Sequence, residues 1–312
     1  MSLLKMSPSP HERASETTAK LMGKVLIALA PALVWACFVF GMRALAVTLV
    51  CVAAAVVTEL LFCLAVKRPI SVLDLSAAVT GVLLAFNLPV SVPLWQAALG
   101  SVFAIAVAKM LFGGIGKNLV NPALAGRVFL LSSFTEEMTS FTADAVSGAT
   151  PLVSLKTGAL PSDSLFDMFI GNMGGCIGEV SSLLLLLGGL FLLVTKVITW
   201  HIPLSFLGTV AVFTFLLPHG AAAFSLDYTL AQLLSGGLML GAIFMATDYV
   251  TAPITPKGKL LYGAGCGLIT VFIRYFGGYP EGVSFAILIM NLLTWYIDKL
   301  TVPKVFGGGK CK

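Results

Sequence analysis

The chain has 312 residues, of which 58% are hydrophobic and 11% are charged. An ordinary soluble domain carries about 25% charged residues, so the composition excludes a soluble protein. The formal net charge is +5, but no basic patch is interleaved with aromatic residues, so no nucleic-acid partner is predicted. The six cysteines form no CxxC pair, and we therefore predict no metal or iron–sulfur site in this chain.

Residues 1–20 are polar and lead directly into an apolar segment, so we expect a retained cytoplasmic tail without a cleaved signal. Long apolar segments follow, and a helix needs about 20 such residues to cross a bilayer. A β-barrel is excluded, because its strands are about 10 residues long and alternate in polarity. The fifth predicted span is the weakest, because Pro122 and Gly126 interrupt it. The ten predicted spans are 22–41, 44–66, 72–88, 94–112, 119–134, 181–199, 202–218, 230–248, 260–276 and 282–300.

Two segments resemble each other across the chain. DLSAAVTGVLLAFNLPVSVP covers 74–93 and QLLSGGLMLGAIFMATDYVTAP covers 232–253. They lie in the third and the eighth span, and this odd separation reverses their direction in the membrane, which indicates an inverted repeat with short broken helices. The alternative is that small residues only let membrane helices pack closely. We expect an all-α polytopic membrane protein with two inverted five-helix repeats, 21–134 and 181–302, in a pattern similar to urea transporters.

The positions of lysine and arginine predict the orientation. With a cytoplasmic N-terminus, fifteen of the 19 basic residues lie on or near the cytoplasmic side, together with the tail 303–312, as the positive-inside rule requires. Loop 135–180 then lies on the outer side, with six acidic residues against the single Lys156. We expect the protein in the inner (cytoplasmic) membrane, where its basic side contacts anionic lipid.

The expected outer loop contains the peptide DAVSGAT at 144–150. Gly148 and Ala149 leave the hydroxyl of Thr150 unhindered, and Pro151 favours an extended backbone at that threonine. These features are typical of a hydroxyl that is presented to another enzyme for modification. The alternative is an ordinary loop rich in Ser, Gly and Thr.

The same peptide matches the D-x-x-S-G-A-T flavinylation motif at Asp144, Ser147, Gly148, Ala149 and Thr150. The chain resembles the family of flavinylated membrane redox proteins that includes the D subunit of Rnf electron-transport complexes and the B subunit of the sodium-pumping NADH:quinone reductase. Its length favours the Rnf type. The other matching stretches are SPSPHERASETTAKLMGKVLIALAPAL at 7–33, FGGIGKNLVNPALAGRVFL at 112–130 and FMATDYVTAPITPKGKLLYG at 244–263.

The resemblance implies FMN attached to Thr150 through a phosphoester by a flavin transferase, and a second, non-covalent flavin such as riboflavin. It implies an enzyme complex, an ion-translocating oxidoreductase that moves electrons between ferredoxin and NAD and couples this transfer to Na⁺ or H⁺ movement. The implied partners are the flavinylated G subunit on the outer face, the membrane-embedded A and E subunits, the NADH-binding C subunit and the ferredoxin-accepting B subunit of an Rnf complex. Two alternatives stay open: the B subunit of the Na⁺-translocating NADH:quinone reductase, and a solute channel or transporter of urea-transporter-like fold.

Asn118, Asn121 and Arg127 are candidates for the non-covalent flavin or for a half-helix site, because an arginine inside a span usually faces a cavity or a partner. Arg127 could neutralise a flavin charge or pair with a backbone carbonyl. Asn121 could instead cap a helix whose first turn holds Pro122.

An ion pathway would use carboxylate, hydroxyl and carbonyl oxygens, which are the ligands of hard cations. Each acidic candidate for such a pathway could instead be a helix cap. Glu59, in the second span, is either linked to proton movement or paired with a basic residue at 67–68. The candidates for the ion pathway are Asp74, Asn87, Thr247 and Asp248.

Overall fold

The regular structure of this chain is almost entirely helical. The exceptions are two-residue strands, β1 (Thr142–Ala143) and β2 (Val146–Ser147), which pair antiparallel. The computed structural model describes residues 16–140, 142–143, 146–147, 151–156, 158, 160–161, 164–171, 174–179, 181–217, 224–279 and 281–303.

The helices fall into two halves joined by a region of short helices. The first half contains α1 (Thr18–Phe40), α2 (Met42–Ala65), η1 (Val72–Asp74), α3 (Ser76–Phe86), α4 (Leu94–Phe103), the π-helical η2 (Ala104–Met110) and α5 (Pro122–Ser133). The joining region contains α6 (Thr135–Thr139), α7 (Pro151–Lys156), α8 (Leu165–Ile170) and η3 (Ile177–Glu179). The second half contains α9 (Ser182–Val194), α10 (His201–Leu216), α11 (Leu226–Leu234), α12 (Leu238–Leu240), the π-helical η4 (Gly241–Met245), α13 (Pro256–Phe276) and α14 (Val283–Thr301).

Within the described residues, four helices are long and apolar enough to cross a membrane, namely α1, α2, α13 and α14. A further span can form from α11 together with residues 238–245, which are bent by 66° at the break between them. Shorter apolar helical stretches occupy 76–86, 94–110, 182–194 and 201–216. The chain is therefore a mostly helical, multi-pass membrane protein, as predicted.

Some helices are shorter than the spans predicted for them. α3 has 11 residues, which is about 16 Å at 1.5 Å per residue and about half of a 30 Å hydrocarbon core. Leu75, with a φ of 63°, separates α3 from η1, and Lys196, with a φ of 57°, follows the end of α9. The predicted spans 72–88 and 181–199 overestimate the lengths of α3 and α9. Hydropathy measures apolar character only, so it does not detect a residue with positive φ that ends or interrupts a helix.

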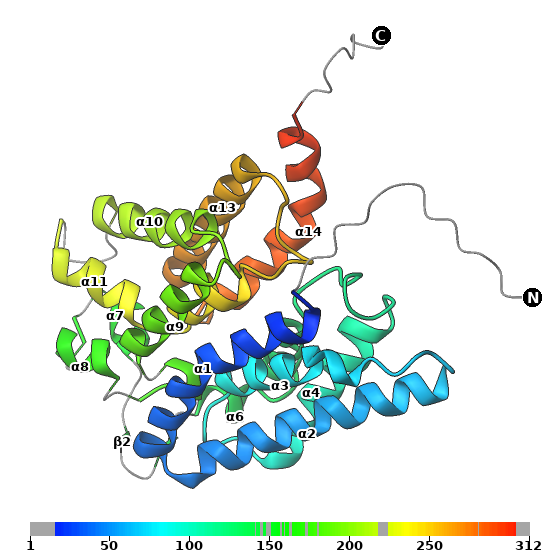
Figure 1. Cartoon of the computed structure of the whole chain (residues 1–312). Coiled ribbons are helices and arrows are strands. Elements are labelled where there is room, and N and C mark those ends of the chain that lie inside the picture. The colour runs from blue at the N-terminus through cyan, green and yellow to red at the C-terminus, as the bar shows by residue number, and fades with distance from the viewer. Residues whose placement is uncertain are drawn as a thin grey trace, which may run out of the picture.

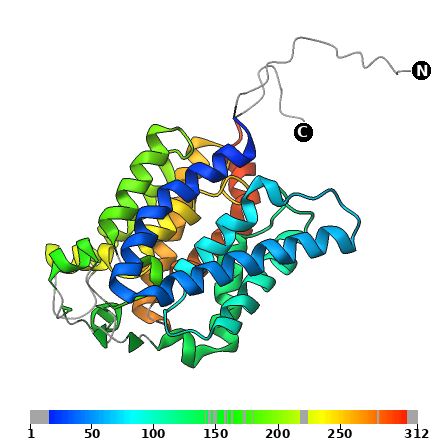
Figure 2. The same ribbon diagram turned by 60° about the horizontal axis from the view of Figure 1, so that its bottom comes forward.

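The two halves pack along α1 with α9 and along α5 with α14. Within the first half α2 packs on α3 and α4, and within the second half α10 packs on α11 and α13. Figure 1 shows the first half, in blue to teal, below the second half, in green to red. The main apolar core takes residues from both halves, so the halves form one body. In Figure 2 the start of α1 and the end of α14 lie at the same end of the molecule.

Candidate functional site

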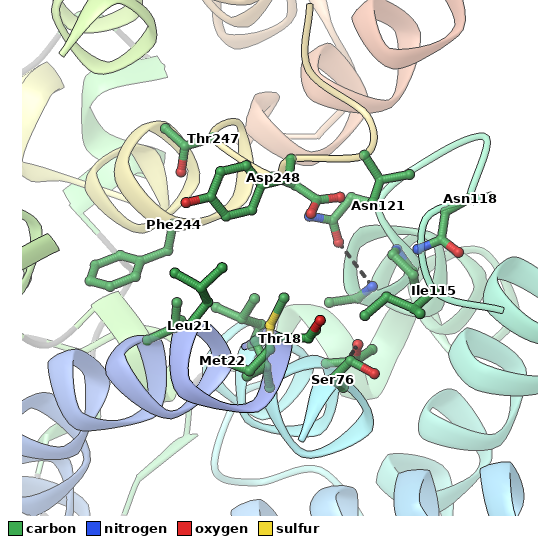
Figure 3. A pocket seen from close by; sticks show the side chains of 18 of the residues that line it. Thr18, Leu21, Met22, Ser76, Ile115, Asn118, Asn121, Phe244, Thr247 and Asp248 are labelled. Carbon is green, nitrogen blue, oxygen red and sulfur yellow. Dashed lines mark hydrogen bonds between the residues drawn. The ribbon is translucent and has the colours of Figure 1, made fainter. Parts of the chain in front are cut away.

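A cavity of about 390 Å³ lies between the two halves. Its walls are the start of α1, α3, the segment that leads into α5, and the residues around the end of η4 (Figure 3). Small-molecule pockets measure about 300–1,000 Å³, so an organic ligand fits here. The polar residues of the lining include Thr18, Ser76, Thr80, Lys109, Asn118, Asn121, Thr247 and Asp248.

Asn121 fixes the cavity wall at the start of α5. Its Oδ1 accepts hydrogen bonds from the N–H groups of Ala123 at 3.0 Å and Leu124 at 3.4 Å. Pro122 occupies the first turn, so the predicted capping arrangement is confirmed. The Nδ2 of Asn121 also donates to the carbonyl oxygen of Met245 at 3.2 Å. One side chain thus begins α5 and joins it to the second half beside the cavity.

Asn118 and Asp248 bring further polar groups to this cavity (Figure 3). The Oδ1 of Asn118 is buried and has no hydrogen-bond partner among the described residues. A buried acceptor without a donor is costly, so a ligand that donates to it would be favoured. Asp248 accepts from the hydroxyl of Thr251 at 3.1 Å. Thr247 also lines the cavity, so residues predicted separately for a flavin and for an ion path lie together.

A buried ion pair adjoins the cavity at Lys109. Its Nζ lies 2.8 Å from Oε2 of Glu59 and donates to Oγ of Ser76 at 2.6 Å. Asp74 in turn accepts from the Oγ of Ser76 at 2.5 Å and from its backbone N–H at 2.9 Å, in an Asx turn just before α3, whose N-cap is Leu75. The pairing of Glu59 with a basic residue at 67–68 is wrong, because Lys109 from η2 takes that place.

Arg127 lies outside the cavity lining, in the middle of α5. Its guanidinium donates to Oδ1 of Asn87 at 2.9 Å and to Oγ of Ser284 at 2.8 Å. It also forms an ion pair with Glu281. The structure therefore separates Arg127 from the two cavity asparagines and joins it to Asn87, at the end of α3.

Charged side chains satisfy both ends of the break between α11 and α12. Arg274 donates to the carbonyl oxygens of Gln232 at 2.6 Å and Ser235 at 3.0 Å, at the end of α11. Glu281 accepts the N–H of Gly237 at 2.8 Å, where the chain enters α12. A cation at the carbonyl end and an anion at the amide end both match the helix dipole. The Arg127 ion pair consequently ties α5 to this break.

The flavinylation motif falls mostly outside the described residues. Asp144, Gly148, Ala149 and Thr150 are not among them, and of Ser147 only the backbone, in β2, is described. The role predicted for this motif therefore stays a prediction.

The helix that directly follows Thr150 is fixed to the second half. The hydroxyl of Tyr228 in α11 donates to the carbonyl oxygen of Leu155 at 3.4 Å. The Cδ1 of Leu152 lies 2.4 Å from the point where Gly236 would carry a Cβ. α7 therefore packs against the break between α11 and α12, and its contact at Leu152 lies two residues after the predicted modification site.

Comparison with known proteins identifies the family. The profile of the NQR2, RnfD, RnfE family matches residues 5–307. The chain belongs to the NQR2, RnfD, RnfE family.

Three relatives of this family member are named as components of translocating complexes. The D subunit of a Na⁺-translocating ferredoxin:NAD⁺ oxidoreductase complex from Acetobacterium woodii is 49% identical over 99% of this chain and 97% of the relative. The D subunit of a proton-translocating ferredoxin:NAD⁺ oxidoreductase complex from Clostridium ljungdahlii is 43% identical over 97% of this chain and 96% of the relative. The D subunit of an ion-translocating oxidoreductase complex from Stutzerimonas stutzeri is 38% identical over 92% of each chain.

Sequence reasoning missed several charged residues of this NQR2, RnfD, RnfE family member. Lys109 and Arg274 counted only toward the charge balance, although both lie within predicted spans, 94–112 and 260–276. A basic residue inside a span is costly and requires partners, and that signal could have selected both. Glu281 lies just before the last predicted span, and no local pattern marks it.

Proposed function

We propose that this chain is the membrane electron-transfer component, the D subunit, of an Rnf-type ferredoxin:NAD oxidoreductase that moves Na⁺ or H⁺ across the membrane. The observation that carries the proposal is the similarity, at 49% identity over 99% of the chain, to a protein named as the D subunit of such a complex. The names of two relatives specify different ions, Na⁺ for one and the proton for the other. The proposal therefore includes both ions.

FMN on Thr150, held through a phosphoester, is the first cofactor of this proposal. The match of residues 144–150 to the flavinylation motif supports it. The fixed position of α7 next to the break supports it further, because a tethered group there is confined to one region of the protein. When bound, FMN supplies the electron-transfer chemistry. A covalent link keeps this water-soluble group on the outer face, which a cytosolic pool does not reach.

The second cofactor of this proposal is a non-covalent flavin, such as riboflavin, bound in the cavity between the two halves. The volume of about 390 Å³ supports this assignment, as does the mixture of apolar walls and a few polar groups, which is typical of cofactor pockets. Asn118 would hold the ligand through its unpaired Oδ1, and Phe244 from η4 would cover an apolar face. Asn121 and Asp248 are the other polar residues that would orient it.

The membrane arrangement that we propose has ten spans in two inverted five-helix repeats. The packing of α2 on α4 has a counterpart in the packing of α10 on α13, which supports the repeat. Each predicted span contains an apolar helical stretch in the described residues. Both termini would lie on the cytoplasmic side of the inner membrane, with 135–180 outside. This agrees with Figure 2, in which the start of α1 and the end of α14 lie at the same end of the molecule.

The partners that we propose are the other components of an Rnf complex. The flavinylated G subunit would meet the outer loop 135–180, and the membrane-embedded A and E subunits would lie beside the spans. The NADH-binding C subunit and the ferredoxin-accepting B subunit would complete the electron path, and a flavin transferase would act during maturation. The names of the relatives, each of which is part of a complex, support this assembly in general.

The test of the covalent FMN is fluorescence of the denatured protein. The full-length chain is expressed with a flavin transferase, denatured and separated on a gel, beside Thr150→Val and the matched control Thr157→Val from the same loop. We expect a fluorescent band for the wild type and for Thr157→Val, and a dark band for Thr150→Val, because valine has no hydroxyl to carry the phosphoester. Flavin released on denaturation of native Thr150→Val would report the non-covalent flavin.

A dark wild-type band, with a transferase shown to act on another substrate, would contradict the covalent FMN.

Purification with partners separates the Rnf protein from the B subunit of the quinone reductase, which belongs to the same family. A ferredoxin-like multi-cluster protein is expected to copurify with the former, and a FAD and [2Fe–2S] reductase with the latter. The family match over 5–307 favours either redox protein over a solute channel.

A further inference from the structure

A second carboxylate, that of Glu179, lies beside Glu281 at the break between α11 and α12. Glu179 ends η3, just before α9, and is only 8% exposed. Its Oε2 accepts a hydrogen bond from the N–H of Cys176 at 3.3 Å. The side chain of Cys176 also forms a hydrogen bond with this carboxyl group, so both of these partners belong to one residue just before η3.

Gly237 lets the two carboxylates approach each other. A Cβ on this glycine would lie 2.5 Å from Oε1 of Glu281 and 3.5 Å from Oε1 of Glu179. The two oxygens are thus no more than about 6 Å apart, a range in which one carboxylate strongly disfavours the charge of another. The absence of a side chain at Gly237 leaves room for both groups.

The nearby cations compensate only one of the two carboxylates directly. Arg127 forms its ion pair with Glu281. The hydrogen bonds of the Arg274 guanidinium go to carbonyl oxygens and to the side chain of Gln232. Within the described residues, Glu179 forms no ion pair. In the described part of the chain, the two carboxylates therefore have only one cation, Arg127, within ion-pair distance, which leaves one negative charge without a counter-ion. A proton on Glu179 neutralises that charge.

The titration behaviour agrees with this geometry. Burial, and next the charge of Glu281, raise the pKa of Glu179 to about 7, although Arg127 acts in the opposite direction. Burial also acts to raise the pKa of Glu281, but Arg127, Arg274 and the N–H of Gly237 together outweigh it, and the pKa of Glu281 is lowered. Burial and the charge of Glu179 raise the pKa of the neighbouring Cys176 thiol, which leaves the thiol neutral. Glu179 is thus the carboxyl group that binds a proton near neutral pH, and Glu281 is the one that stays charged.

Water can reach Glu281, one member of the pair, from the side of the joining region. A small cavity of about 40 Å³ is lined by Glu281, Ser284, Thr139 and Tyr279, among others. A water molecule needs about 10–15 Å³ of such space and two to four polar partners, and these side chains supply them. Thr139 belongs to α6, the start of the segment 135–180, so this opening faces that segment.

We propose that Glu179 and Glu281 form a proton-binding site at the break between α11 and α12. Glu179 takes up one proton and becomes a neutral carboxylic acid, and the small cavity beside Glu281 is where water meets the pair. Glu281 keeps its charge because Arg127 holds it. The site consists only of described residues of this chain, so it depends neither on a bound flavin nor on the assignment to a complex.

The experiment measures the proton itself. Infrared difference spectra of the full-length chain in lipid nanodiscs are recorded between about pH 5 and 9, where the C=O stretch reports a protonated carboxyl group. The variants are Glu179→Gln and the matched control Glu136→Gln, an exposed glutamate of α6. We expect a band that disappears with a midpoint of about pH 7 in the wild type. It should be unchanged in Glu136→Gln and absent in Glu179→Gln.

A second variant, Glu281→Gln, tests the coupling and serves also if Glu179→Gln does not fold. It removes the like charge and frees Arg127, so the midpoint of Glu179 should fall by about 1 to 3 pH units. A wild type without a carboxyl band that titrates in this range overturns the proposal. So does a band that persists in Glu179→Gln, or a midpoint that stays or rises in Glu281→Gln. A failure to bind flavin would leave each of these outcomes readable.

Discussion

Two buried ion pairs in this protein join residues from distant parts of the chain. Lys109 and Glu59 are 50 residues apart, and their side chains are 2% and 0% exposed. Arg127 and Glu281 are 154 residues apart. Removing both members of such a pair often costs little, whereas removing one leaves an uncompensated buried charge. This asymmetry makes the pairs testable residue by residue.

Lys109→Met should destabilise the protein strongly, by about 3–5 kcal/mol, because Glu59 would stay buried without its cation. The double variant Lys109→Met/Glu59→Gln should recover most of this loss, since neither of the two positions then carries a charge. Denaturant unfolding in mild detergent measures the difference in the free energy of unfolding. Lys117→Met, at an exposed lysine, is the control and should have little effect. Equal losses in the single and the double variant would contradict the pairing.

At the scale of elements, the break in the eighth predicted span determines what the second half can bind. An unbroken helix would satisfy its own amide and carbonyl groups. The break at Gly236, with a φ of 68°, instead leaves an end of α11 for Arg274 and an amide for Glu281. Hydropathy placed one continuous span at 230–248, because it measures apolar character and not the direction of the chain. The two helical segments are bent by 66° at this break, and both carboxylates lie beside Gly237 there.

Gly237→Ala tests the close packing at this break. The new Cβ would lie 2.5 Å from Oε1 of Glu281, so the carboxylate or the backbone must move. Overpacking of this kind costs about 1–3 kcal/mol. Gly208→Ala, in α10, meets no atom within 4 Å and should be neutral or slightly stabilising, because alanine favours helices. The measurement is the midpoint of thermal unfolding of both variants in the same mild detergent. Equal midpoints for Gly237→Ala and Gly208→Ala would contradict the close packing at Gly237.

At the scale of the whole molecule, the sequence predicted the helical membrane class and the approximate position of each apolar helical stretch. It also selected Asn118, Asn121 and Asp248, which the structure places around one cavity. Arg127 was grouped with them because of its neighbours in sequence, and the fold turns it toward Glu281 instead. Contacts between the two halves could not be predicted, since no spacing along the chain encodes which helix of one half meets the other.

The stability of the whole molecule should vary with pH because of Glu179. Its pKa is raised from the ordinary value of 4.5 to about 7 in the folded protein. Between these two values the native state holds more protons than the unfolded state, so stability falls as the pH rises through this window and then levels off. Glu281 acts in the opposite sense and at lower pH. Its lowered pKa gives stability that is present above its ordinary value and is lost as the pH falls through its folded pKa.

The two contributions can be separated because their pH windows differ. In Glu179→Gln no proton is gained on folding at this position, so its advantage over the wild type should grow from about pH 5 to about pH 7 and stay constant above. Glu136→Gln should follow the wild type across the same range. The measurement is the midpoint of thermal unfolding at each pH, compared as a difference so that other titrating groups cancel. A difference that does not change with pH would mean that Glu179 is already ionised in the folded protein, and that the break holds two charged carboxylates beside Arg127.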